Sequence, residues 1–334
     1  MRDVAARAGV SLKTVSRVVN AEAGVSPALA ARVEAAAAEL DYRPNLTASN
    51  LRRADQRTRT IGLLVEDVAN EFFAGIHRGV EDVARRRGVA VMAASLDRDP
   101  AAEVDLVTAL ASRRVDGLIL SRTAPDQAYL ASEIRSGLPI VCVDRQPEGV
   151  DVDVVLTNNR EAAREGVRHL LGHGHTRIAY IGGDMLLTTA RERYAGFVEE
   201  MTALGAPIRP EWVQGDAVTV EQAYAVATRI LACEERPTAF FSAQNLITMG
   251  VFRALRDRGL QRSIALVGFD DFQLADLLEP GITVVAQDPR AMGQRAAEIL
   301  FQRMDHDDDA AQEPQTHVIA SRLITRGSGE IRPA

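Results

Sequence analysis

Two hydrophobic patterns divide the chain. Up to about residue 60, apolar side chains recur three and four positions apart, which is the spacing of short amphipathic helices. Beyond that point, short apolar runs alternate with stretches of helical period, most of them roughly ten to twenty residues long. The pattern predicts a small helical unit followed by a larger α/β body.

Three short helices are predicted in the first unit. Residues 2–8 have helical spacing and stop at Gly9, a residue that tolerates the left-handed conformation of a helix C-terminus. Ser11 is placed to cap a second helix over 12–20, and Pro27 stands at the first position of a third. Two short helices joined by a tight turn form the helix-turn-helix arrangement.

The second helix has a face with no packing role. Lys13 and Arg17 lie one turn apart on this face, opposite an apolar stripe of Val15, Val18 and Val19. From a helix in the major groove, such cationic side chains reach guanine O6 and N7. An isolated charged pair would favour a merely solvated face, but the three-helix context favours DNA.

Net charge supports this division. Residues 1–60 hold ten Lys and Arg against six Asp and Glu, whereas the remaining residues hold 29 against 40. A basic head on an acidic body is typical of a nucleic-acid-binding module attached to a part with another task. No apolar stretch approaches the roughly 20 residues of a membrane span, and the N-terminus lacks the apolar core of a signal peptide, so we expect a soluble cytoplasmic protein.

The body is predicted to be α/β, with two doubly wound parallel-sheet subdomains, because it has too many apolar runs for one sheet. Ligand is expected in the crevice at the carboxyl ends of the strands. The predicted strands cover 61–65, 89–94, 117–120, 140–143, 152–156, 178–181, 239–241, 265–268 and 283–286.

Polar residues follow these predicted strands. Carboxylates, amides and an arginine, with one or two aromatic side chains, suit a polyhydroxylated ligand whose hydroxyls both donate and accept hydrogen bonds. A sugar or sugar derivative is therefore the expected effector. The strand-end residues include Asp67, Asn70, Phe72, Phe73, Asp144, Arg145, Gly182, Gly183, Thr189, Arg193, Gln244, Asn245, Asp270, Asp271, Gln287 and Asp288.

The head resembles that of LacI-type (LacI/GalR) transcriptional regulators through Asp3-Val4-Ala5, 8–11, 14–20 and Tyr42-Arg43-Pro44-Asn45. The body resembles the periplasmic-binding-protein-like core of the same family through 141–145, 174–183, Arg193 and 267–271. The resemblance implies domains at 1–44 (helix-turn-helix), 45–58 (hinge helix and linker) and 59–334. It divides the last into an N-subdomain of about 59–157 and 289–317 and a C-subdomain of about 158–288 and 318–330.

The resemblance also implies roles for individual residues. Leu12, Lys13 and Arg17 would read bases, and Thr14, Ser16 and Asn20 would hold phosphates. Ala48 and Leu51 match the hinge helix, where leucines of two subunits wedge into the minor groove. The effector contacts implied by the strand ends and the resemblance together are Asp67, Asn70, Phe72, Phe73, Asp144, Thr189, Arg193, Gln244, Asp270 and Gln287.

We therefore expect a regulator, with repression favoured, that binds a palindromic operator as a homodimer and responds to a small sugar-like effector. Departures from the family pattern at Gln244-Asn245 and Ala217 leave the effector's identity open; the family has an aromatic residue at position 217, whose loss disfavours a purine. No metal, cofactor or catalytic motif is predicted, since His169, His173 and His175 lack completing ligands. The alternatives are a solute-binding or enzymatic α/β protein, or a constitutive DNA binder with a vestigial cleft.

Overall fold

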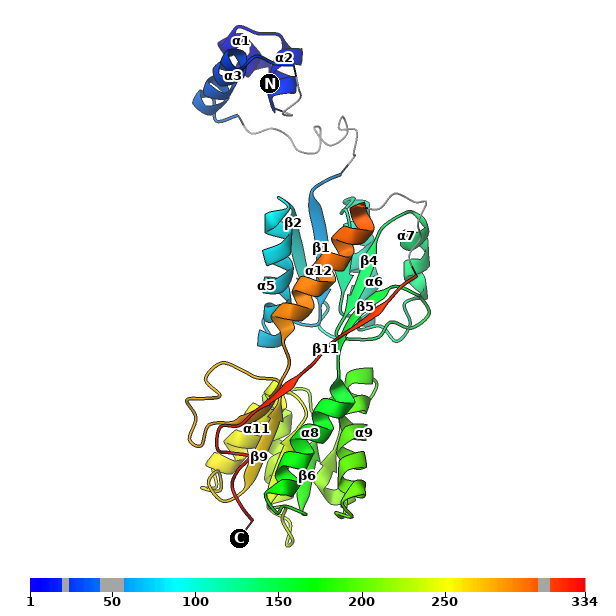
Figure 1. The fold of residues 1–334 in the computed structure, drawn as a ribbon, viewed down its shortest axis with the longest axis vertical. Coiled ribbons are helices and arrows are strands. Elements are labelled where there is room, and N and C mark those ends of the chain that lie inside the picture. Colours follow the sequence, from blue (N-terminus) through cyan, green and yellow to red (C-terminus); the bar gives the residue numbers. More distant parts are fainter. Residues whose placement is uncertain (20–23, 43–56, 306–312, 334) are drawn as a thin grey trace. The chain divides into compact units, whose positions relative to one another are not determined.

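The protein is described by a computed structural model that covers residues 1–19, 24–42, 57–305 and 313–333. It divides into two compact units, Met1–Arg59 and Thr60–Ala334 (Figure 1). The first unit is helical, and the second contains both sheets.

The described residues of the first unit form the helices α1 (Arg2–Ala8), α2 (Leu12–Val19) and α3 (Pro27–Glu39). Gly9 ends α1 with φ of 63°, the left-handed conformation that the sequence predicts at this position. Ser11 accepts a hydrogen bond from the Thr14 amide at 3.1 Å, so it caps α2 as expected. Val4, Val15 and Val33, one from each helix, are buried together in its small core.

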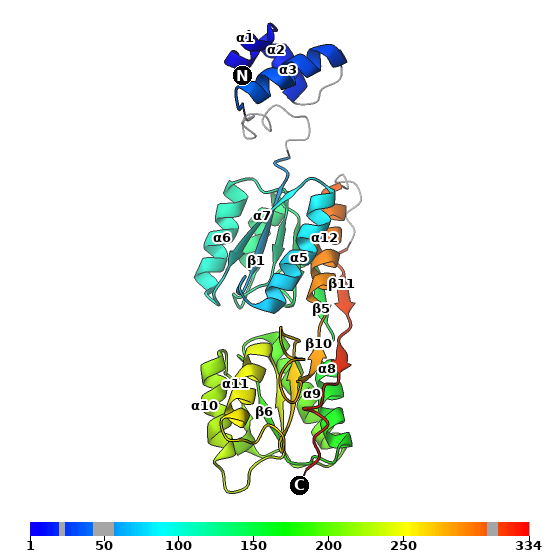
Figure 2. The ribbon, with the colours of Figure 1, turned by 90° about the vertical axis from the view of Figure 1, so that its left-hand side faces the viewer.

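The N-lobe of the second unit is built on a six-stranded sheet in the order β11-β5-β4-β3-β1-β2, in which every strand pair is parallel. Helices α5 and α12 cover one face and α6 covers the other, as Figure 2 shows. The elements are β1 (Thr60–Val65), α5 (Glu71–Arg86), β2 (Ala90–Ser95), α6 (Pro100–Ser112), β3 (Leu118–Leu120), η1 (Ala128–Leu130), α7 (Ala131–Arg135), β4 (Ile140–Val143), β5 (Asp153–Thr157), α12 (Pro289–Asp305) and β11 (Thr316–Ile319).

Successive side chains of β1 point to opposite faces of the sheet, which explains this layering. Ile61 and Leu63 belong to the cluster under α5 and α12, whereas Leu64 belongs to the cluster under α6. Helices α5 and α12 approach each other through glycines. A Cβ on Gly293 would stand 2.1 Å from the backbone oxygen of Ile76, so only glycine fits there.

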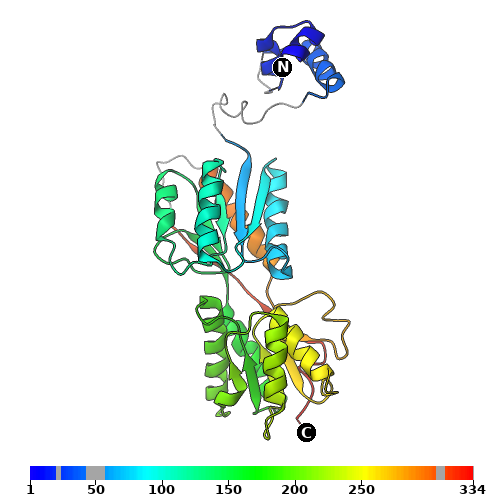
Figure 3. The same ribbon diagram turned by 180° about the vertical axis from the view of Figure 1, so that it is seen from behind.

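The C-lobe repeats the same architecture, with a six-stranded sheet in the order β12-β10-β9-β8-β6-β7. Helices α8 and α9 cover one face, and α10 and α11 cover the other, which faces the viewer in Figure 3. The elements are α8 (Asn159–Gly172), β6 (Ile178–Ile181), α9 (Thr188–Ala203), η2 (Pro210–Trp212), β7 (Val213–Gln214), α10 (Val220–Leu231), β8 (Ala239–Ser242), α11 (Asn245–Arg256), β9 (Ala265–Phe269), β10 (Thr283–Ala286) and β12 (Arg322–Ile324).

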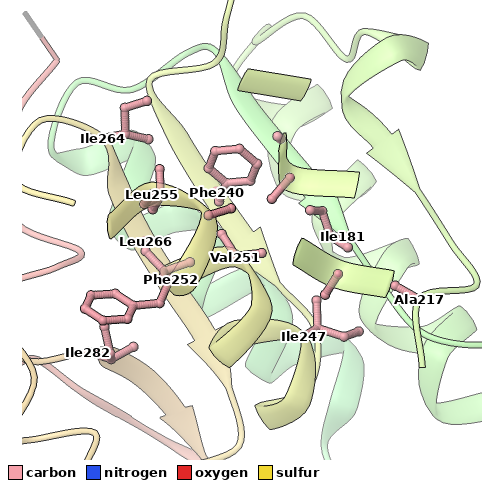
Figure 4. Packing of buried hydrophobic residues seen from close by; sticks show 14 of the residues in the cluster. Ile181, Ala217, Phe240, Ile247, Val251, Phe252, Leu255, Ile264, Leu266 and Ile282 are labelled. Carbon is pink, nitrogen blue, oxygen red and sulfur yellow. The ribbon is translucent and has the colours of Figure 1, made fainter. Parts of the chain in front are cut away.

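The core under α10 and α11 is continuous and apolar. Phe240 and Leu266 on the sheet face Val251 and Leu255 on α11 (Figure 4). Ala217 belongs to the same cluster. Apolar packing thus holds α11 on the sheet, together with a hydrogen bond between the hydroxyls of Ser242 on β8 and Thr248 on α11 at 2.8 Å.

The predicted α/β class with two doubly wound subdomains is confirmed, and each of the nine predicted apolar runs forms a strand. Two details differ. Strand β12 pairs antiparallel with β10, since the chain returns from β11 without a helical crossover. The expected subdomain boundary between residues 317 and 318 falls inside β11, which stays paired with β5 as far as Ile319.

Candidate functional site

A cavity lies between the two lobes, where loops from the carboxyl ends of both sheets meet. It encloses about 520 Å³, open solvent at its mouth included. This is the position expected for ligands of doubly wound sheets. The residues around it are Glu66, Asn70, Phe72, Phe73, Arg98, Asp144, Arg145, Gly183, Asp184, Leu187, Thr189, Ala190, Arg193, Ala243, Gln244, Asn245, Asp270 and Gln287.

Direct contacts bridge the two lobes beside this cavity. The amides of Asn70 and Asn245 donate to each other, at 3.4 and 3.2 Å. Asn70 also caps α5 by accepting from the Phe72 amide at 3.0 Å. On α9, the Thr188 hydroxyl accepts from Arg122 of the N-lobe at 3.3 Å. A third contact joins the lobes through the Glu71 carboxylate, which accepts a hydrogen bond from the Gln273 amide at 2.6 Å.

Arg193 is fixed in the C-lobe wall of the cavity. Its Nε donates to Asn159 at 2.7 Å, and its Nη1 donates to the Ala243 carbonyl at 2.8 Å. The guanidinium lies over the Phe269 ring at 3.9 Å, and Nη1 is 3.6 Å from Asp270 Oδ2. These contacts hold a buried cation in one orientation before any ligand arrives.

Each lobe contributes one buried aspartate at an equivalent place. Asp144 follows β4 with φ of 70°, and Asp270 follows β9 with φ of 68°. Each amide donates to the neighbouring strand at 2.9 Å, which fixes the unusual backbone conformation. Burial raises the pKa of Asp144 to about 6 against the attraction of Arg145 and Arg193, and burial also raises the pKa of Asp270.

Gln287 completes the C-lobe wall. Its Nε2 donates to Asp270 Oδ1 at 2.5 Å, and a carboxylate acceptor on that side sets the orientation of the amide. Its carbonyl oxygen Oε1 is buried and has no hydrogen-bond partner among the described residues. A ligand hydroxyl is the kind of group that satisfies such an acceptor.

Nine of the ten effector residues predicted from the sequence surround the cavity: Asn70, Phe72, Phe73, Asp144, Thr189, Arg193, Gln244, Asp270 and Gln287. The tenth, Asp67, does not line it. Its carboxylate accepts from the Ala69 amide at 2.8 Å, closing the turn before α5. Ala217 also lies elsewhere: its side chain is 2% exposed in the core under α10, so the space left by the missing aromatic ring is filled by protein.

Three charged residues around the cavity were missed by the sequence analysis: Glu66, Arg98 and Asp184. Glu66 directly follows β1, and Arg98 stands in the loop after β2. The strand-end rule applies to Glu66 as it does to Asp144, so its position alone was a usable signal. The same rule covers Arg98, which follows the end of β2 by three residues, and Asp184, which follows the end of β6 by three residues.

The predicted DNA-reading side chains gather on α2. Leu12 is 45% exposed and Lys13 is also exposed, while Thr14, Ser16 and Arg17 are half-buried. The Thr14 hydroxyl is hydrogen-bonded to Ser11 at 2.9 Å, so it also belongs to the helix cap. Asn20, Ala48 and Leu51, and with them the predicted hinge helix, lie outside the described residues.

A helical head with an exposed cationic helix face, followed by a two-lobed body with a polar cleft, is an arrangement typical of DNA-binding transcriptional regulators. Residues 1–45 match the bacterial regulatory proteins of the lacI family, and residues 167–329 match the periplasmic binding protein-like domain. The HTH-type transcriptional repressor PurR of Haemophilus influenzae is 32% identical over 98% of both chains.

Solved structures agree with these matches. The chain is similar to the transcriptional regulator CelR in its cellobiose complex, with a TM-score of 0.72 at 32% identity and 98% coverage of both chains. It is also similar to the Lac repressor bound to ONPG in the repressed state, with a TM-score of 0.85 at 29% identity and 98% coverage of both chains. The chain belongs to the lacI family of bacterial regulatory proteins, a family of DNA-binding transcriptional regulators rather than enzymes.

The described residues contain neither a membrane-spanning helix nor a metal cluster. No described helix combines the length and the apolar character that a membrane crossing needs. Among the same residues, no group of three or more His, Cys, Asp and Glu side chains could hold a metal ion. His169 contacts Glu330 at 2.5 Å, and His175 is engaged by Thr238 and by the Ile331 carbonyl.

Proposed function

We propose that this protein is a cytoplasmic repressor that binds a palindromic operator as a homodimer and responds to a sugar or sugar derivative in the cleft between its lobes. The observation that carries the proposal is the cleft itself: it combines buried carboxylates, amides and a fixed arginine with Phe72 and Phe73. This mixture suits hydroxyl groups on one side of a ligand and an apolar ring face on the other. The similarity to CelR, whose structure holds cellobiose, supports the same effector class.

In the proposed head, α2 enters the major groove with Leu12, Lys13 and Arg17 toward the bases and with Thr14, Ser16 and Asn20 toward phosphates. Ala48 and Leu51 would enter the minor groove from the hinge. A single helix-turn-helix reads few base pairs, so specificity requires two heads on a palindrome. For the second copy we propose contacts through α5 and residues 277–282, where Leu277 is 71% exposed.

Selection of DNA from a random duplex library by the full-length protein tests operator binding. The expected result is a palindromic sequence whose affinity exceeds that of scrambled DNA. Lys13→Met should reduce this preference by about five- to a hundredfold, since one base-reading contact contributes about 1–3 kcal/mol. Arg7→Met is the matched control, because it removes a cation from the same unit that is exposed and forms an ion pair with the exposed Glu39 at 2.6 Å. Selection of no palindrome, or equal effects of the two variants on specificity, contradicts the proposal.

Calorimetry with a panel of neutral sugars tests the effector class, followed by measurement of operator affinity with and without each sugar that binds. The expected result is a sugar that binds the body and changes operator affinity. The same titration determines whether the effector induces or co-represses. Operator binding that no panel sugar alters would support a constitutive binder with a vestigial cleft.

A further inference from the structure

Glu66 lies between two arginines in the wall of the cleft. If the cleft is the effector site, as proposed above, this carboxylate affects which effectors can bind. Its Oε1 accepts a hydrogen bond from Arg98 Nε at 2.8 Å and forms an ion pair with Arg98 Nη2 at 2.7 Å. Its Oε2 accepts from Arg145 Nη2 in a close ion pair. The carboxylate is 5% exposed, so it bridges the two arginines with almost no contribution from solvent.

Glu66 is ionised at neutral pH. Burial alone would raise its pKa, but the charges and hydrogen bonds of Arg145 and Arg98 outweigh burial and hold the pKa below its ordinary value. Arg145 also donates from Nη1 to the Arg122 carbonyl at 2.8 Å, and its Nε lies 3.4 Å from Asp144. Both guanidiniums therefore have a carboxylate partner within the cavity wall.

The whole lining carries no surplus positive charge. Its arginines are Arg98, Arg145 and Arg193, and the third of these faces Asp270 at 3.6 Å. Its carboxylates are Glu66, Asp144, Asp184 and Asp270, so the acidic groups are at least as numerous as the basic ones. An anionic ligand would have to displace a carboxylate from an arginine or be buried beside it, and both alternatives are costly in a partly dehydrated cleft.

We propose that Glu66 is a specificity-determining residue that selects uncharged effectors and excludes their phosphorylated or carboxylated counterparts, by neutralising Arg98 and Arg145. An arginine pair without this carboxylate would form an anion site, since guanidiniums bind phosphate and carboxylate through paired N–H groups. The side chain at position 66 thus decides which of the two ligand classes the same cleft accepts.

Inorganic phosphate is the probe for the first experiment, and calorimetry on the full-length protein is the measurement. Glu66→Gln keeps the shape of the side chain and removes its charge, so phosphate affinity should rise by about tenfold or more, the factor expected when a charged hydrogen bond becomes available. Adding Arg98→Met to Glu66→Gln should abolish the gain. Arg98 is half-buried at the cavity wall, which makes its replacement tolerable for folding.

Asp184→Asn is the matched control. It removes the same charge from the same cavity, but the Asp184 carboxylate is hydrogen-bonded to the Leu186 amide at 2.8 Å rather than to an arginine. An equal gain in Asp184→Asn would assign the effect to overall charge and overturn the role of Glu66. No gain in folded Glu66→Gln would overturn it directly.

A second measurement needs no variant and so does not depend on the folding of Glu66→Gln. The wild-type protein is titrated with glucose and glucose 6-phosphate, and with ribose and ribose 5-phosphate. Tighter binding of a neutral member than of its phosphate supports the proposal, and equal or tighter binding of a phosphate overturns it. If no sugar binds, the proposed effector class fails, while the phosphate experiment still decides the role of Glu66.

Discussion

Asp144→Asn is expected to stabilise the ligand-free protein at pH 7.5. In the folded protein, burial raises the pKa of this carboxyl from its ordinary value of 3.8 to about 6. A difference of that size corresponds to about 3 kcal/mol of unfolding free energy. Asparagine fits the same space without a charge, and the pKa of about 6 already includes the opposing attraction of Arg145, 3.4 Å away. We therefore expect a net gain of about 1–3 kcal/mol.

The pH dependence follows from the direction of the shift. Because the folded-state pKa is raised, the folded protein binds more protons than the unfolded chain between about pH 4 and pH 6. The wild type thus loses stability as the pH rises through this window, and the loss is complete above it. The advantage of Asp144→Asn should be largest at pH 7.5 and should shrink steadily toward pH 4.

Urea denaturation of both proteins at pH 7.5, 6.0 and 4.5 measures this difference. Asp151→Asn, an exposed aspartate in the same lobe, is the control and should leave stability nearly unchanged. A variant that is less stable than wild type at pH 7.5, or a difference that does not vary with pH, would refute the reasoning. We also expect Asp144→Asn to bind effector more weakly. A buried carboxylate that lowers stability is typical of a binding site, where it serves the ligand.

Three other substitutions follow from the described contacts. Arg193→Ala should abolish the effect of the effector on operator affinity but leave operator binding without effector intact, and operator titrations measure this. The same substitution should lower the unfolding free energy of the body by about 2–4 kcal/mol in urea denaturation, because Asp270 loses its counter-charge. Gly293→Ala should destabilise the body by about 1–3 kcal/mol, because the added Cβ would meet the Ile76 carbonyl. Gly172→Ala is the control: its Cβ would enter open space, so in thermal melts only Gly293→Ala should lower the melting temperature. Ser11→Ala should cost about 1 kcal/mol of unfolding free energy by removing the cap on α2, and an unchanged urea midpoint of the head unit would contradict this.

Hydrophobic periodicity was sufficient to predict most of the body. Runs such as 140–143 are apolar throughout because the strands are buried on both faces. Such a run can be recognised in the sequence even when the adjacent strands are not known. Strand β7 has two residues, and β12 is short with no fully buried residue, so neither has a run of sufficient length to be recognised. Their pairing depends on the strands already in place beside them.

The residues of the candidate cleft could be predicted from the sequence where they follow the end of a strand. Asp144, Arg193 and Gln287 follow that rule, and the structure places all three around one cavity. Asp67 follows the rule as well, yet its carboxylate is used by the Ala69 amide within its own turn. Whether a polar side chain serves its own backbone or a cavity depends on χ angles and neighbours that the sequence does not specify.

The sequence by itself determined the helix-turn-helix head, the alternating α/β body and the polar character of the strand ends, because each depends on local spacing and residue type. Only the tertiary structure decided which of these polar groups neutralise one another. Glu66, Arg98 and Arg145 come from three separate loops, and their ion pairs exist because the doubly wound sheet brings those loops to one edge. The charge balance of the cleft, on which effector choice depends, is therefore a property of the fold.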